Sequence, residues 1–178
     1  MTVFDALIDL DGNGRPIYGD SPFRVIKDHT LVGNNETVVV PIFTLTGSVM
    51  LTRLWGVVTT DLGANHTAAS WRLNDQTSQV YLTAVGGTTL SAIKAGSVIL
   101  KDKLVAVALT KLDNAAGAVG ETATAGIPIF SPVVIVKKTA ATTQIEYRYV
   151  TTDSPTSGAI RFFASYYPLS SDGLLETA

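Results

Sequence analysis

The sequence predicts an all-β protein, a single antiparallel β-sandwich of about eight strands with an extended N-terminal arm. Three observations lead to this prediction. Threonine and valine, which favour strands, are abundant, and no stretch shows the i, i+3, i+4, i+7 apolar spacing of an amphipathic helix. Several runs alternate apolar and polar residues, and turn residues separate them every 8–12 positions or so. The length of 178 residues fits one domain.

The clearest alternation lies in two runs near the C-terminus, Thr143–Thr151 and Gly158–Tyr167. The first run places three large residues on one face: Ile145, Tyr147 and Tyr149. Its other face, which carries Glu146, is expected to meet solvent. The second run places four residues on one face: Ile160, Phe162, Ala164 and Tyr166. Because turn residues 153–158 separate the two runs, we expect them to form a long hairpin.

The remaining strands are expected earlier in the chain. Gly47 separates an alternating run from a second run that is apolar on both faces. The expected strands are Thr37–Thr46, Ser48–Thr59, the stretches around Trp71 and Leu82, Leu104–Thr110, Pro132–Lys138 and a weaker run at Ser97–Leu100. Eight strands in two sheets is the jelly-roll number, with an up-and-down barrel or an immunoglobulin-like sandwich as alternatives.

Two segments do not follow the strand pattern. Residues 1–36 are rich in glycine, aspartate and proline, and we interpret them as an N-terminal arm with a short strand at Phe23–Ile26. Residues 37–178 then form the jelly-roll-like sandwich. Lys111–Gly126 is rich in alanine and glycine and is expected to be a long exposed loop.

Composition excludes several classes of function. The net charge is −2, from 13 basic and 15 acidic residues without a basic stripe, so we expect no nucleic-acid partner. The chain has no cysteine, which excludes disulfides, cysteine zinc sites and cysteine nucleophiles. The start MTVFDALIDLDGNG lacks the basic region of a signal peptide, and no apolar run approaches the length of a membrane span.

Catalytic chemistry is not expected, and neither is a cofactor. The two histidines, His29 and His66, lie among turn-like polar residues and are interpreted as surface residues. A serine nucleophile elbow and a phosphate-binding glycine loop are both missing from the sequence. Glu146 is the one carboxylate we find within the strands, whereas a glycosidase needs a facing pair.

One local pattern resembles a calcium loop. Asp9, Asp11 and Asn13 match its first three side-chain ligands, and Asp20 falls where the bidentate glutamate usually stands. Pro16 occupies the position of an apolar β-branched residue, and neither flank is helical in pattern. We therefore expect no metal and interpret the segment as a turn in the arm.

Aromatic residues gather near the C-terminus. Those on the Phe162 face are expected to pack in the core. Alternation points Phe163 and Tyr167 to the opposite face, so we predict these two for a subunit interface.

Two stretches resemble structural proteins of tailed-phage particles. They are PIFTLTGSVMLTRLWGVVTT (Pro41–Thr60), with a glycine between two strands and a G-V-V-T-T ending, and SGAIRFFASYYPLSSDG (Ser157–Gly173), with an aromatic strand before Tyr-Pro-Leu. The chain is similar in these motifs to jelly-roll-type head decoration, or cement, proteins. The similarity covers roughly Pro41 to Gly173 and leaves the arm unaccounted for.

The resemblance implies a non-enzymatic virion protein on the capsid surface, made in the host cytoplasm. It implies a homotrimer that binds the major capsid protein between capsomers, with an arm that reaches the capsid or a neighbouring subunit. The expected apolar anchors of that arm are Phe4, Ile8, Ile17, Tyr18 and Phe23. The alternatives are a tail, baseplate or fibre component and a carbohydrate-binding sandwich module.

Overall fold

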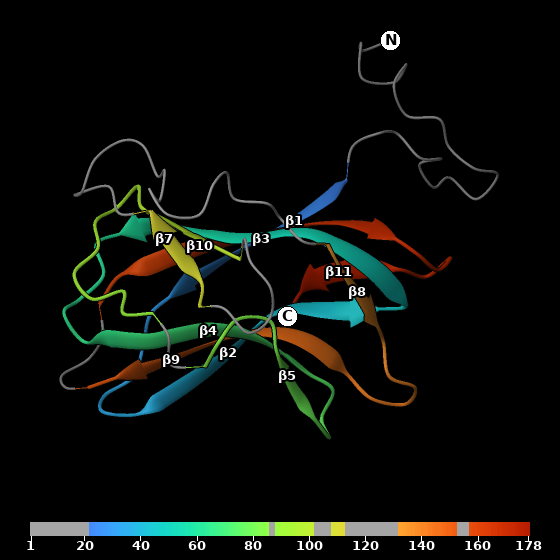
Figure 1. Cartoon of the computed structure of the whole chain (residues 1–178), viewed down its shortest axis with the longest axis horizontal. Coiled ribbons are helices and arrows are strands. Elements are labelled where there is room, and N and C mark those ends of the chain that lie inside the picture. Colours follow the sequence, from blue (N-terminus) through green and yellow to red (C-terminus); the bar gives the residue numbers. More distant parts are fainter. Residues whose placement is uncertain (1–21, 86–87, 102–107, 113–131, 153–156) are drawn as a thin grey trace, which may run out of the picture.

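The computed structural model describes residues 22–85, 88–101, 108–112, 132–152 and 157–178. Within these ranges the regular structure is entirely β, arranged as two antiparallel sheets of six and five strands that stack face to face (Figure 1). The predicted all-β sandwich is therefore confirmed. In the same ranges the structure holds no helix that could serve as a membrane span.

Each sheet combines strands from the beginning, the middle and the end of the chain. The six-stranded sheet contains, in order, β1 (Phe23–Thr30), β10 (Ala159–Pro168), β3 (Ser48–Thr60), β6 (Val98–Leu100) and β7 (Thr110–Leu112), with β8 (Val133–Val136) paired to the first part of β3. The five-stranded sheet contains β11 (Leu174–Thr177), β2 (Thr37–Thr46), β9 (Thr143–Thr151), β4 (His66–Asn74) and β5 (Gln79–Tyr81). The pairs are nested, because β1 pairs with β10, β2 with β9, and β4 with β5.

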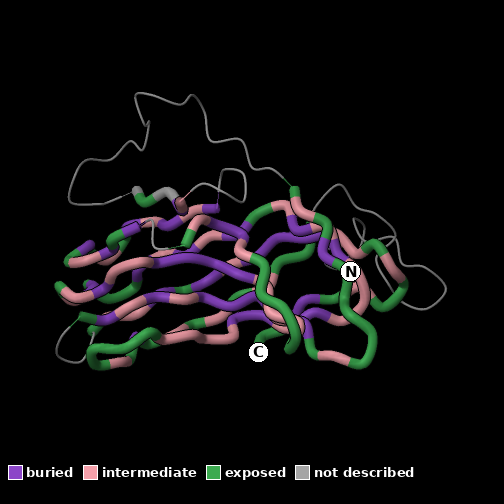
Figure 2. Tube along the Cα trace, turned by 60° about the horizontal axis from the view of Figure 1, so that its bottom comes forward, coloured by how far each residue is buried: buried purple, intermediate pink, exposed green. Residues whose placement is uncertain are grey.

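The core fills the space between the two sheets. Trp71, Tyr147 and Phe43 from the five-stranded sheet are completely buried, as is Phe162 from the six-stranded sheet. The rings of Tyr147 and Phe162 meet across the core with centroids 4.9 Å apart. Figure 2 shows buried positions concentrated along the strands of both layers. Burial of these rings and of the aliphatic side chains around them is the main favourable contribution to a fold of this kind.

The expected hairpin between the last two long strands is wrong. The bounds of β9 agree with the prediction and those of β10 agree to within one residue, as do the inward faces, but the two strands belong to different sheets. β9 pairs with β2 and β4, whereas β10 pairs with β1 and β3. Alternation identifies the buried face of each strand but not the partner strand, and here the two buried faces oppose each other across the core.

The boundary between the predicted arm and the sandwich is also wrong. Phe23–Thr30 forms a full edge strand, β1, in register with β10 along its whole length. Lys27 points inward from β1 and donates to the main-chain oxygens of Pro41 (3.1 Å) and Ala178, which belong to the opposite sheet. The sandwich thus begins at Phe23 rather than at residue 37, and residues 1–21 of the expected arm lie outside the described ranges.

Gly47 makes the corner between β2 and β3, as its position in the sequence predicts. The chain leaves one sheet at Thr46 and enters the other at Ser48, so a single residue connects the two layers. Gly47 has φ of 64°, which glycine adopts freely. A Cβ atom at Gly47 would collide with Ser170 and Asp172.

The middle of the chain is described only in part. The predicted run at Ser97–Leu100 is confirmed as β6, and that at Pro132–Lys138 as the shorter β8. Thr110–Leu112 forms β7, so the first residues of the expected loop Lys111–Gly126 belong to a strand. The rest of that loop and residues 104–107 of the neighbouring expected strand lie outside the described ranges.

Candidate functional site

The outer face of the six-stranded sheet carries an apolar row that crosses four strands. Residues paired across neighbouring antiparallel strands share a face. Phe163 on β10 pairs with Ile26 on β1 and with Trp55 on β3, and Trp55 pairs in turn with Leu100 on β6. Because neighbouring Phe162 points into the core, this row points outward. We call Ile26, Phe163, Trp55 and Leu100 the apolar row.

A second set of apolar side chains extends this face toward β8. Tyr167 on β10 pairs with Met50 on β3, and Met50 pairs with Val134 on β8. Val134 is 60% exposed and Val136, on the same strand, 66%. Tyr167 and Met50 are half-buried, as are Trp55, Phe163 and Leu100. The outer face of an antiparallel sandwich is usually polar, so this row of half-buried and exposed apolar side chains is a candidate interaction surface.

The centre of this face is ordered by ring stacking. The rings of Trp55 and Phe163 are nearly parallel, at 6°, with centroids 5.0 Å apart. The guanidinium carbon of Arg24 lies over the ring of Phe163, 5.8 Å from the ring centroid. A rigid aromatic pair with a cation above it loses little side-chain entropy when a partner binds.

Basic residues surround the apolar row. Arg24 and Arg53 are both paired with Ser165, so they lie on the same face and on either side of β10. Arg161 binds Asp28 through two hydrogen bonds of 2.7 and 2.9 Å. This ion pair lowers the pKa of Asp28 and raises the pKa of Arg161, mainly through the side-chain hydrogen bond. The face therefore combines an apolar centre with exposed arginines.

The structure places only some of the residues predicted for an interface on this face. Phe163 and Tyr167 lie on it, as alternation predicts. Phe23 does not: it pairs with inward-facing Tyr166, and the two rings stack with centroids 5.7 Å apart. The other predicted anchors and the candidate calcium ligands lie outside the described ranges: Phe4, Ile8, Ile17, Tyr18, Asp9, Asp11, Asn13 and Asp20.

Trp55 and Val134 were not predicted for an interface from the sequence. The run that became β3 is apolar on both faces, and nothing in it distinguishes an outward tryptophan from a buried one. A register shift lies in β3 opposite Ser165 and Tyr166, so Leu51 and Leu54 both point inward although they are an odd number of residues apart. Simple alternation therefore fails at this strand.

The outer face of the five-stranded sheet is polar, and the expectation of a solvent-exposed Glu146 is wrong. Glu146 is buried beside Arg72, whose Nε donates to its Oε2 at 2.6 Å, and the two side chains are 5% and 10% exposed. Asn74 donates to Oε1 of Glu146 at 2.8 Å, and Arg72 also donates to Gln79 at 2.6 Å. Each member has its partner within the network, which is the arrangement of a structural ion pair.

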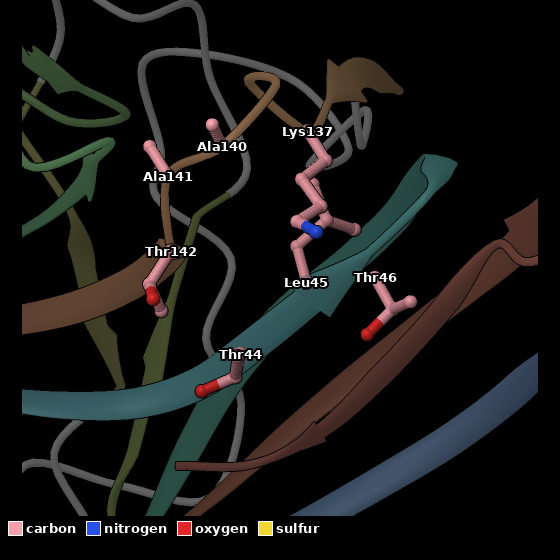
Figure 3. A pocket seen from close by; sticks show the side chains of 7 residues that line it. All are labelled: Thr44, Leu45, Thr46, Lys137, Ala140, Ala141 and Thr142. Carbon is pink, nitrogen blue, oxygen red and sulfur yellow. The ribbon is translucent and has the colours of Figure 1, made fainter.

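A shallow open pocket of about 340 Å³ lies beside the end of β2 (Figure 3). Seven residues line it: Thr44, Leu45, Thr46, Lys137, Ala140, Ala141 and Thr142. The side chain of Lys137 and the threonine hydroxyls offer hydrogen bonds. None of these described lining residues is aromatic, so the pocket offers no ring on which a sugar can stack.

Both histidines depart from the expected surface positions. His66 begins β4 and is completely buried, and burial together with His29 lowers its pKa to about 3. His29 lies in β1 and is half-buried, which lowers its pKa, with a further contribution from Lys27. A histidine kept neutral by burial is a structural element of the core.

Within the described part of the chain, no three histidine or acidic side chains gather closely enough to hold a metal ion. Comparison with known proteins identifies no relative: no protein-family model, curated protein or solved structure matches this chain. The geometry of the outer face of the six-stranded sheet is therefore the strongest indication of function.

Proposed function

We propose that this chain is a non-enzymatic structural protein of a tailed-phage particle, a decoration protein that binds the outside of the head between capsomers. The proposed assembly is a homotrimer, and the proposed partner is the major capsid protein. The observation that carries the proposal is the apolar, arginine-rimmed outer face of the six-stranded sheet. The resemblance of Pro41–Thr60 and Ser157–Gly173 to head decoration proteins supplies the class of particle.

The strand order supports the jelly-roll class for this sandwich. Strand pairs nested from the ends of the chain toward its middle arise when one long antiparallel ribbon wraps into two sheets. β1 with β10, β2 with β9, β3 with β8, and β4 with β5 are such pairs, and in this order they alternate between the six-stranded and the five-stranded sheet. Double-sheet jelly rolls have this arrangement and are common in viral capsids.

The size of the whole outer face of the six-stranded sheet suits contact with a second copy. β10 has 10 residues, and four neighbouring strands at about 4.8 Å spacing and about 3.4 Å per residue give a face of about 650 Å². A stable protein interface buries about 800 Å² per partner, so this face with its rim is large enough. Closure of the assembly would also cover edge strands such as β1.

The proposed role has a simple thermodynamic basis. A protein that binds only the expanded lattice of capsid subunits stabilises that lattice by mass action. A trimer that contacts several capsid subunits at once multiplies a modest contact into strong retention. Neither effect needs a catalytic residue or a cofactor.

The proposal is tested by adding purified protein to heads of the encoding phage that lack it and measuring binding by sedimentation. We expect saturable binding to expanded heads. Val134→Asp, on the outer face of the six-stranded sheet, is expected to abolish trimer formation and to weaken binding at least about 10-fold. Val80→Asp is the matched control, because Val80 is 55% exposed but lies in the five-stranded sheet. Absence of binding by the wild-type chain, or equal effects of the two variants, contradicts the proposal.

A further inference from the structure

The only two histidines of the chain lie at the same end of the sandwich and surround one tyrosine. The ring of His66 stacks on Tyr149 with centroids 4.5 Å apart, and the ring of His29 is 6.5 Å from that of Tyr149. His66 comes from β4, His29 from β1 and Tyr149 from β9, so the cluster joins both sheets.

Tyr149 fastens the segment that connects β1 to β2. Its hydroxyl accepts a hydrogen bond from the amide of Val32 (3.0 Å) and donates one to the carbonyl of the same residue (2.8 Å). Residues 31–36 are held further by Thr151, whose hydroxyl accepts from the amide of Glu36 at 3.0 Å. The Tyr149 hydroxyl therefore holds the connection that follows β1, and His66 packs directly against the ring of this tyrosine.

Neither histidine has a place for a second proton. Nε2 of His66 shares a hydrogen bond of 2.9 Å with the hydroxyl of Tyr147, while its Nδ1 is buried without a partner. Nε2 of His29 is likewise buried without a partner. A protonated imidazole has two N–H donors, so protonation would leave a charged donor unsatisfied in the core.

The surrounding groups supply no counter-ion. Lys27 on β1 disfavours a charge on His29, and Tyr147 and Tyr149 on β9 are neutral, with pKa values raised by burial. The negative charge of Glu36, which precedes β2, contributes to the raised pKa of Tyr149. The Glu36 carboxylate accepts a hydrogen bond from the amide of Asn34. Among the described residues, no carboxylate forms an ion pair or a hydrogen bond with either imidazole.

We propose that His66 and His29 form an acid-sensitive latch, which holds β1 and residues 31–36 against the sandwich at neutral pH and releases them when the imidazoles take up protons. The open state exposes both rings to water, where they bind protons normally. Acid therefore favours opening of this end of the sandwich before the rest of the fold. The latch does not depend on the proposed virion role.

The pH range follows from the direction of the shift. The closed state keeps His66 neutral down to about pH 3, whereas an exposed histidine takes up its proton at about 6.5. The stability of the closed state thus falls as the pH decreases from 6.5 toward 3. At pH 5.0, His66 alone is expected to raise the population of the open state about 30-fold relative to pH 7.5.

Hydrogen exchange of the full chain tests this inference directly. Protection of peptides from residues 22–36 is compared with that of peptides from β9 at pH 7.5 and 5.0, after correction for the intrinsic exchange rate. We expect protection of residues 22–36 to fall at least about 30-fold, the contribution of His66 alone, while β9 stays protected. Unchanged protection, or an equal loss in both regions, overturns the latch.

Two further measurements separate the latch from general acid instability. In the NMR spectrum we expect the imidazole C–H signals of His66 to stay at their neutral positions at pH 5.0, and titration near 6.5 overturns the inference. His66→Gln keeps a hydrogen-bonding group for Tyr147 but cannot titrate, so the pH dependence of exchange should shrink to that of His29. If this variant does not fold, His29→Gln, at the half-buried position, is expected to reduce the dependence, and an unreduced dependence counts against a joint latch.

Discussion

The buried ion pair between Arg72 and Glu146 allows a quantitative test of the packing on the five-stranded sheet. We consider Glu146→Leu, Arg72→Met and the double variant. Each single change removes one charge and leaves the other in a site where the side chains are only 5% and 10% exposed. Asn74 also loses its 2.8 Å acceptor when Glu146 is replaced.

The expected magnitudes follow from the cost of an unpaired buried charge. Each single substitution should lower the free energy of unfolding by about 3–5 kcal/mol, because one partner stays buried without the other. Glu146→Leu should lie at the upper end, since it also leaves Asn74 without its partner. The double variant removes both charges and should lie within about 2 kcal/mol of the wild type, so the coupling energy is about 4 kcal/mol or more.

The assay is urea denaturation of the four proteins, with the slope of the transition checked for constancy. Arg161→Met is the control, because it breaks an exposed pair with Asp28 on the other sheet and should hardly move the midpoint. Single-variant effects below about 1 kcal/mol, or effects that simply add, would refute the reasoning. The Arg72–Glu146 pair would then be a solvated surface contact.

Three other predictions concern the turns and the boundary of the sandwich. Gly47→Ala should destabilise the fold by about 1 kcal/mol or more, because alanine is strained at φ of 64° and its Cβ meets Asp172; an unchanged urea midpoint contradicts this. Deletion of residues 1–21 should leave the melting temperature unchanged, whereas deletion of residues 1–36 should lower it by at least about 5 °C, because β1 is lost. Equal melting temperatures of the two truncated chains would count against β1 as part of the sandwich. Asp75 accepts hydrogen bonds from the amides of Ser78 and Thr77, which lower its pKa to about 2, so its carboxyl should stay ionised as the pH falls from 3.8 toward 2; an NMR titration with an ordinary midpoint near 3.8 would argue against this turn.

Much of the fold follows from local pattern. Thr37–Thr46 and Thr143–Thr151 are strands with the predicted bounds, because each alternates clearly over its length. The pairing of the strands could not be predicted from this pattern. The strands that carry Tyr147 and Phe162 show the same apolar alternation whether they pair within one sheet or face each other across the core. The full length of β1 was not predicted, because an edge strand pairs with a neighbour on one side only and tolerates charged residues such as Lys27.

The candidate site could be predicted only where alternation is regular. Phe163 and Tyr167 follow from the regular part of β10, whereas Trp55 lies in a strand with a register shift. The environments of Glu146 and His66 depend on residues far away in the sequence: Arg72 is 74 positions from Glu146, and Tyr147 is 81 positions from His66. Such contacts arise from topology, which local periodicity does not encode.

The proposed role in a phage head is tested most directly by the copy number of the chain in purified virions. Quantitative mass spectrometry compares it with the major capsid protein of the same particles. A decoration protein that occupies lattice sites between capsomers predicts a ratio near one chain per capsid subunit. A few copies per particle would contradict decoration and favour a tail or vertex position, and complete absence from the virion would refute the proposed function.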